Sequence, residues 1–229
     1  MSIHDDNATV IVAGGSGLVG NELMKILLDD DPIGHIYALV RKPLPYFHPK
    51  LEQIQHSDLQ IVDWSEEKKV PKFGFICLGT TMRQAGSKAE LERIDYELVC
   101  SVAQEMKVLG VSHLAVVSSY GASLRSFSHY LRTKGKMEEA LRQMEFEHLV
   151  LVRPGPLKGL RDEPRTDEAI VQGILKVFSP VMIGPLAKLI PISATDVARS
   201  MLFSLFRHSS RKVETLNSVD MKNMLNLYQ

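Results

Sequence analysis

The stretch from Val10 to Gly20 constrains the fold most, because it joins a buried strand to a helix through a glycine-rich turn. Residues 10–13 (VIVA) are apolar and mostly β-branched, which is typical of a strand buried on both faces. The turn GGSGLVG follows, and an amphipathic helix comes after it. This order opens a dinucleotide-binding βαβ unit, in which the helix N-terminus binds phosphates. We therefore expect a nucleotide site here, rather than a strand–helix turn that merely contains glycine.

Each glycine of this turn has an expected role. Gly14 takes a backbone geometry closed to other residues, Gly17 carries no Cβ to block a diphosphate, and Gly20 lets the helix lie close to the sheet. The turn residues that we expect to contact the cofactor are Gly14, Ser16, Gly17, Leu18, Val19 and Gly20.

Strand and helix patterns alternate along the rest of the chain. We expect further strands at 35–40, 52–55, 73–78, 113–118 and 149–152, helices at about 88–109, 128–144 and 195–206, and a last strand and short helix from Val213. This alternation predicts an α/β fold, a Rossmann-type doubly wound parallel sheet, in one domain over 1–229. Glycine and proline recur in 156–193, which we expect to form a small C-terminal cap over the strand ends.

Composition limits the classes of binding partner and the cellular compartment that we expect. The chain of 229 residues carries 27 basic and 27 acidic side chains, so no global field points to nucleic acid. Cys77 and Cys100 have neither metal nor redox spacing, and we expect buried thiols in a reducing compartment. The histidines are scattered without ligand spacing, so no metal site is expected. We find no signal-peptide pattern and no membrane-spanning run, and we expect a cytoplasmic protein.

Tyr130 and Lys134 are candidate catalytic residues. They lie four apart on a predicted helix and so share a face. A carbonyl that accepts a hydride needs a proton at its oxygen, which a phenol can donate. A lysine cation about 4 Å away stabilises the resulting phenolate by roughly 4 kcal/mol at an effective dielectric constant of about 20. The alternative is a surface Tyr and Lys on an amphipathic helix.

A serine pair ends the strand before that helix. A hydroxyl of Ser118 or Ser119 can hydrogen-bond the substrate oxygen and stabilise the charge that develops on it. We favour Ser119, because the strand must end before a side chain can turn toward the site. Two serines in an ordinary turn are the alternative.

The residues after the second strand indicate which nicotinamide cofactor is bound. NAD-selective folds carry a carboxylate at this strand tip, and here the tip reads Leu39-Val40-Arg41-Lys42. Arg41 can grip a 2′-phosphate with its planar fork, and Lys42 adds a point charge. We therefore expect NADP(H), unless the two basic side chains merely solvate a loop.

Taken together, the motifs resemble the atypical short-chain dehydrogenase/reductase family, in the group of the Tat-interacting oxidoreductase. The resemblance covers roughly residues 9–155. The residues that carry it are Gly14 to Gly20, Cys77-Leu78-Gly79-Thr80-Thr81 with Ala85-Gly86, Asp95-Tyr96, Ser118-Ser119-x-Gly121-Ala122, Tyr130-x-x-x-Lys134-Gly135 and Arg153-Pro154-Gly155.

The resemblance implies NADP(H) binding, with Tyr130 as proton donor and acceptor. It implies an adenine contact for Asp58, and it places Leu78, Gly79 and Thr80 beside the nicotinamide ribose. The chain departs from the mammalian pattern in two places. Leu18-Val19 replaces Glu-Thr, and Arg41-Lys42 replaces Arg-Arg. Neither departure defines the substrate.

Two classes of function follow. The first is an NADP(H)-dependent oxidoreductase, or a related epimerase or dehydratase, acting on a small carbonyl or hydroxyl compound through Ser119, Tyr130 and Lys134. The second is a nucleotide-sensing regulator without turnover. The intact catalytic set favours the first, because a sensor needs no proton donor.

The long helix also raises the question of a dimer. Its apolar positions Leu91, Ile94, Leu98 and Val102 exceed what one sheet-covering face needs, if Val99 and Leu109 also lie inward. We expect either a homodimer through this helix and the Tyr130 helix, or an ordinary core helix.

Overall fold

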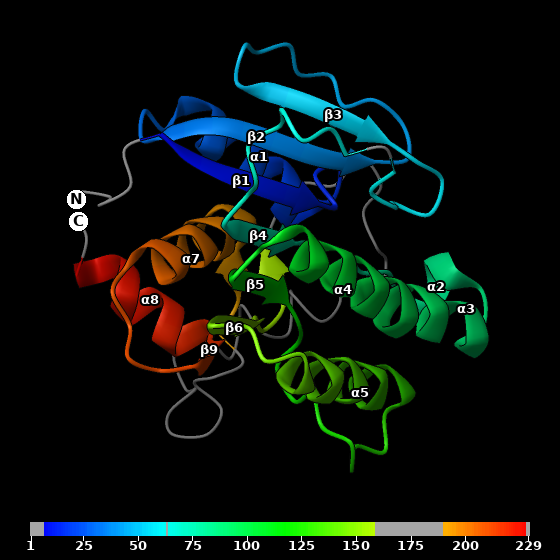
Figure 1. The fold of residues 1–229 in the computed structure, drawn as a ribbon. Coiled ribbons are helices and arrows are strands. Elements are labelled where there is room, and N and C mark those ends of the chain that lie inside the picture. The colour runs from blue at the N-terminus through cyan, green and yellow to red at the C-terminus, as the bar shows by residue number, and fades with distance from the viewer. Residues whose placement is uncertain (1–6, 63, 159–189, 228–229) are drawn as a thin grey trace.

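The computed structural model describes residues 7–62, 64–158 and 190–227 as a three-layer α/β fold (Figure 1). Seven parallel strands form one sheet in the order β3-β2-β1-β4-β5-β6-β9. The strands are β1 (Ala8–Ala13), β2 (Ile33–Val40), β3 (Leu51–Gln55), β4 (Phe73–Ile76), β5 (His113–Val117), β6 (His148–Arg153) and β9 (Val213–Asn217). The predicted Rossmann-type doubly wound sheet is confirmed, including the last strand and helix.

Helices cover both faces of the sheet because its central strands are apolar on both sides. One face packs against α1 (Leu18–Asp29), α7 (Ala194–Phe206) and α8 (Ser218–Leu227). The other packs against the long helix after β4 and against α5 (His129–Gln143). Every residue of β1 is buried, as expected for a strand enclosed by two helical layers.

The long helix differs from the prediction of one regular α-helix over 88–109. It consists of α3 (Lys88–Glu92), a π-helical segment η1 (Arg93–Leu98) and α4 (Val99–Leu109). A π turn holds an extra residue and rotates the inward face. Asp95 and Val99 are therefore buried, whereas Ile94 and Leu98, which we expected to face inward, are only partly buried.

The strand order reverses between β1 and β4, where the crossovers leave the sheet in opposite directions. Ligands of doubly wound sheets bind in the crevice beyond the carboxyl ends of the strands at this point. A separate pair of short parallel strands, β7 (Leu157–Lys158) and β8 (Ile192–Ser193), brackets the expected cap. Residues 159–189 of that cap lie outside the described residues, so the cap stays a prediction.

Candidate functional site

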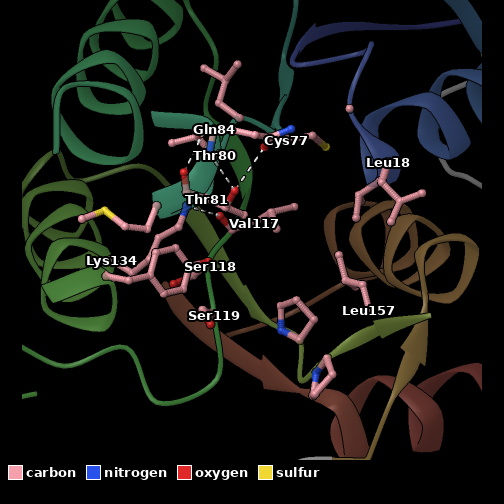
Figure 2. A pocket seen from close by; sticks show the side chains of 18 of the residues that line it. Leu18, Cys77, Thr80, Thr81, Gln84, Val117, Ser118, Ser119, Lys134 and Leu157 are labelled. Carbon is pink, nitrogen blue, oxygen red and sulfur yellow. Dashed lines mark hydrogen bonds between the residues drawn. The ribbon is translucent and has the colours of Figure 1, made fainter. Parts of the chain in front are cut away.

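A cavity of about 1160 Å³ lies at the carboxyl ends of the central strands (Figure 2). Its walls come from the glycine turn and α1, the loop after β4, the end of β5, α5, and the segment after β6. Figure 2 shows Leu18 and Leu157 on one side of the cavity, and Lys134, Ser118 and Ser119 on the other. The predicted site residues that line it are Ser16, Gly17, Leu18, Val19, Leu78, Gly79, Thr80, Ser119, Tyr130 and Lys134.

The glycine turn is packed too tightly for side chains at its two ends. Gly14 has a φ of +88°, and a Cβ there would lie 2.7 Å from the carbonyl carbon of Cys77. A Cβ on Gly20 would lie 2.0 Å from the carbonyl oxygen of Gly14. These two glycines therefore shape the turn from behind, and neither lines the cavity.

The N-terminus of α1 is free to bind an anion. Gly17 is its N-cap residue, no side chain caps the first turn, and that turn carries no acidic residue. The first N–H groups of a helix have no partner within the helix and carry a partial positive charge. Since residues 16–19 line the cavity, this end of it suits a phosphate group.

Lys134 is buried and paired with Asp95, a residue that sequence reasoning did not place in the site. Its Nζ lies 2.6 Å from Oδ1 of Asp95, and the two side chains are 2% and 0% exposed. Nζ also donates a hydrogen bond of 3.4 Å to the carbonyl oxygen of Val117. Burial by itself would lower the pKa of Lys134, but Asp95, together with Tyr130 and Glu138, outweighs burial and raises it. Lys134 is therefore charged at neutral pH.

Asp95 links two walls of the cavity. Its Oδ2 accepts a hydrogen bond of 2.9 Å from the backbone N–H of Thr80, while Oδ1 faces Lys134. Its position in η1 explains this reach, since the π turn brings Asp95 onto the buried face. In the sequence Asp95 stands out only through the family resemblance, because a regular helix gives no reason to expect it inside.

The structure distinguishes the two serines. Oγ of Ser118 is buried and donates a hydrogen bond of 2.6 Å to Oε1 of Glu138. Oγ of Ser119 has only a long contact, 3.4 Å, with the carbonyl oxygen of Tyr120. Both serines line the cavity, so Ser119 holds the more available hydroxyl.

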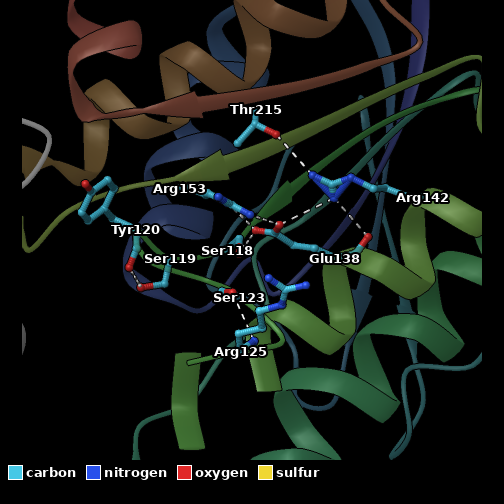
Figure 3. A network of polar contacts seen from close by, with 9 residues as sticks. All are labelled: Ser118, Ser119, Tyr120, Ser123, Arg125, Glu138, Arg142, Arg153 and Thr215. Carbon is cyan, nitrogen blue, oxygen red and sulfur yellow. Dashed lines mark hydrogen bonds and ion pairs between the residues drawn. The ribbon is translucent and has the colours of Figure 1, made fainter. Parts of the chain in front are cut away.

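Glu138 is the centre of a polar network that includes Ser118 of the cavity wall (Figure 3). Besides Ser118, it accepts two hydrogen bonds from Arg153, of which that from Nε measures 2.8 Å. Its Oε2 lies 3.7 Å from Nη1 of Arg142. Hydrogen bonding to Glu138 raises the pKa of Arg153 further, against the effect of burial. Because Glu138 lies in α5, this network anchors the helix that carries Tyr130 and Lys134.

The segment after β4 contains a short helix that the sequence patterns did not predict. It is α2 (Met82–Ala85), whose N-cap Thr81 accepts a hydrogen bond of 3.3 Å from the N–H of Gln84. Met82 and Gln84 line the cavity together with Arg83. A helix of four residues is too short to detect by periodicity, but the Thr81 cap and the following Gly86 mark its start and its end in the sequence.

The proposed nucleotide contacts farther from the glycine turn do not line the cavity. Arg41 and Lys42 follow β2, Asp58 follows β3, and all three are exposed. Gln55 donates a hydrogen bond of 3.3 Å to the carbonyl oxygen of Arg41, and Ser57 donates one of 3.0 Å to Asp58. Since β2 pairs with β1, Arg41 and Lys42 leave the sheet at the same edge as the glycine turn. Their roles remain predictions.

Both cysteines are free thiols. Burial raises the pKa of Cys77 to about 12 and that of Cys100 to about 11, so neither thiol ionises at neutral pH. Among the described residues, no group of three His, Cys, Asp or Glu side chains is placed to hold a metal ion. No helix within the described ranges is long and apolar enough to cross a membrane.

Sequence comparison connects the chain to two sets of relatives. A family model described as HIM1 matches residues 66–179. Protein FMP52, mitochondrial, of Candida glabrata is 34% identical over 67% of this chain and 65% of its own length, and that of Candida albicans is 31% identical over 83% and 85%. Protein HTATIP2 of Rattus norvegicus is 29% identical over 93% of this chain and 87% of its own length.

Solved structures share the fold at low sequence identity. MoeE5 in complex with UDP-glucose and NAD superposes with a TM-score of 0.64 at 15% identity, over 97% of this chain and 82% of its own. Human epimerase family protein SDR39U1 with NADPH gives a TM-score of 0.59 at 17% identity, over 90% and 72%.

The expectation of a cytoplasmic protein is wrong on this comparison, because the fungal relatives are named as mitochondrial proteins. The missing secretory-signal pattern and the free thiols, on which that expectation rested, suit more than one reducing compartment. The resemblance to the short-chain dehydrogenase/reductases, by contrast, is confirmed by both sequence and fold. The chain belongs to the family of the FMP52 proteins and is also similar to HTATIP2.

Proposed function

We propose that the protein is an NADP(H)-dependent oxidoreductase that acts on a small carbonyl or hydroxyl compound. The observation that carries the proposal is one cavity with a polar set at one side and an uncapped helix N-terminus at the other. The polar set is Ser119, Tyr130 and Lys134. A sensor without turnover has no need of a proton donor beside a buried lysine.

The residues present fit a nicotinamide dinucleotide. The N–H groups at the start of α1 suit its diphosphate. Gly14 packs closely on Cys77, and Gly20 packs closely on Gly14, so the turn carries no side chain at either position that could fill this end of the cavity. Arg41 and Lys42 at the tip of β2 suit a 2′-phosphate, as no carboxylate stands beside them in sequence. The cofactor, when bound, supplies or accepts the hydride. NADPH in the human epimerase-family structure is consistent with this choice.

The chain's own residues supply the proton and hold the oxygen. When a carbonyl is reduced to an alcohol, its oxygen gains a proton, for which the Tyr130 hydroxyl is the donor. The Lys134 cation, held by Asp95, stabilises the phenolate that Tyr130 then carries. The Ser119 hydroxyl donates a hydrogen bond to the oxygen as negative charge develops there. In the oxidative direction the same groups remove the proton.

An epimerase is the second candidate, and the solved structures that share the fold are the reason. They include proteins named as UDP-sugar epimerases. An epimerase would use the same tyrosine to remove and return a proton, so the residues alone do not separate the two reactions. Net conversion of NADPH with a carbonyl compound supports the oxidoreductase, whereas isomerisation without net change in the cofactor supports the epimerase.

The test begins with the nucleotide that copurifies with the protein, which mass spectrometry identifies after release. Carbonyl compounds are then screened for NADPH oxidation. Tyr130→Phe should lower turnover by about 10²- to 10⁴-fold with cofactor affinity nearly unchanged, because only the proton donor is lost. Tyr120→Phe is the matched control, since Tyr120 lies ten residues away and does not line the cavity. Wild-type turnover in Tyr130→Phe would contradict the mechanism.

A further inference from the structure

Arg83 is the charged side chain in the cavity wall for which the proposed mechanism has no use. Among the described residues that line the cavity, Arg83 and Lys134 are the charged ones, both are cations, and no carboxylate joins them. The charge of Lys134 is compensated by Asp95 at 2.6 Å. The uncompensated charge of the described wall is therefore that of Arg83.

Arg83 also differs from its neighbour Arg93 on the helical run that follows. Arg93 donates hydrogen bonds of 2.8 Å and 2.7 Å to Glu90. Arg83 is exposed and makes no ion pair with any residue in the described ranges. A guanidinium carries five donors in a planar fork that matches a carboxylate or phosphate. The donors of Arg83 are available to a ligand in the cavity.

Hydrogen bonds fix the backbone that carries Arg83 relative to Lys134. Thr81 caps α2 at its start, and Gly86, with a φ of +74°, closes it through a hydrogen bond of 3.0 Å to the carbonyl oxygen of Met82. One residue before Thr81, the N–H of Thr80 is bound to Asp95, which also holds Lys134. The Asp95 carboxylate thus positions both Lys134 and the backbone that leads into α2.

The segment from Cys77 to α2 runs from the phosphate end toward the reacting groups. Cys77 packs on Gly14 of the glycine turn, and a Cβ on Gly79 would lie 3.5 Å from Nζ of Lys134. Figure 2 shows Thr80 and Gln84 across the cavity from Leu18, which belongs to the phosphate end. Arg83 precedes Gln84 in α2 and lines the same cavity, so it lies on the segment that leads away from the phosphate end, where a substrate rather than the diphosphate is expected.

We propose that Arg83 binds an oxyanion group of the substrate and so selects anionic carbonyl compounds over neutral ones. This inference rests on the proposed function and names its substrate class. A charge-assisted hydrogen bond to an exposed guanidinium contributes a binding free energy at the lower end of the range for such bonds. The affinity for an anionic compound should therefore exceed that for its neutral analogue by roughly tenfold.

The test uses a matched pair of probes, 4-carboxybenzaldehyde and its neutral methyl ester. Calorimetry with the NADP⁺-loaded protein measures the affinity for each probe, and NADPH oxidation measures kcat/KM. We expect the unmutated protein to prefer the acid by roughly tenfold, Arg83→Gln to abolish that preference without changing the affinity for the ester, and Arg83→Lys to retain part of it. Arg93→Gln, which removes an arginine that is also exposed but is paired with Glu90, is the control and should keep the preference.

The two ideas fail in different ways. Equal binding of acid and ester by the unmutated protein, no binding of the acid at millimolar concentration, or an unchanged preference in Arg83→Gln would each overturn the role of Arg83. So would a loss of NADP⁺ affinity in Arg83→Gln with the acid preference intact, because Arg83 would then bind the cofactor. An acid preference in calorimetry that depends on Arg83, without oxidation of NADPH, would overturn the oxidoreductase and leave anion binding standing.

Discussion

The buried pair of Asp95 and Lys134 allows the sharpest prediction for stability. Replacing Asp95 by Asn leaves the Lys134 ammonium in a site where its side chain is 2% exposed. In the described part of the chain, the other hydrogen-bond acceptor of Nζ is the carbonyl oxygen of Val117 at 3.4 Å. Removing one partner of a buried ion pair costs about 3–5 kcal/mol, because the remaining charge is left without compensation.

The protonation of Lys134 sets an upper limit to this loss. In the Asp95→Asn variant, Lys134 can release its proton and so avoid a buried charge. At pH 7 this release costs about 5 kcal/mol, taking the reference pKa of lysine for the unfolded chain. At pH 9 the same release costs only about 2 kcal/mol. We therefore expect Asp95→Asn to lower the free energy of unfolding by about 3–5 kcal/mol at pH 7 and by no more than about 2 kcal/mol at pH 9, relative to the unmutated protein at the same pH.

Urea unfolding followed by circular dichroism and by the fluorescence of the single Trp64 measures these changes. The double variant with Lys134→Met completes a thermodynamic cycle. Since both charges are then removed, its loss should be at least about 2 kcal/mol smaller than the sum of the two single losses. Additive losses, or a loss in Asp95→Asn that is the same at pH 7 and pH 9, would refute the argument that the pair compensates a buried charge.

The remaining predictions concern the cofactor, pH and assembly. Arg41→Ala combined with Lys42→Ala should weaken NADP binding by about two orders of magnitude and leave NAD binding almost unchanged, and equal affinity of the unmutated protein for NAD and NADP in low-salt calorimetry would contradict this. Burial is the main cause that lowers the pKa of His113 and His148. Their protonation therefore favours the unfolded chain, and the urea midpoint should fall as pH drops below about 6.5, with a smaller fall when both are replaced by Gln. If the long helix and α5 form a dimer interface, light scattering should give twice the 25.6 kDa of one chain, and a single-chain mass at all concentrations would exclude the dimer.

Much of the fold was predictable because local signals agree with the tertiary structure. The run from Val10 to Gly20 combines a buried strand with a turn whose Gly14 has a positive φ, and each signal is visible without knowledge of distant residues. The spacing of Tyr130 and Lys134 likewise fixes their common face, since the periodicity of a helix is a local property. Both side chains do line the cavity.

The interior of the site was not predictable, because it depends on contacts between residues far apart in the chain. Asp95 reaches Lys134 only because a π turn rotates the long helix, and no local pattern marks that turn. Glu138 is an ordinary polar residue in the helical pattern, and only the fold brings Ser118, which follows β5, and Arg153, which ends β6, to its carboxylate.

The sequence by itself therefore determined the doubly wound sheet, the glycine turn and the face that presents Tyr130 and Lys134. The tertiary structure alone decided that the Ser118 hydroxyl is bound to Glu138, which carboxylate compensates Lys134, and that Arg83 stands uncompensated in the described cavity wall. The physical reason is that backbone patterns arise from neighbours in sequence. The energetics of a buried charge depend instead on whatever the fold places within a few ångströms of it.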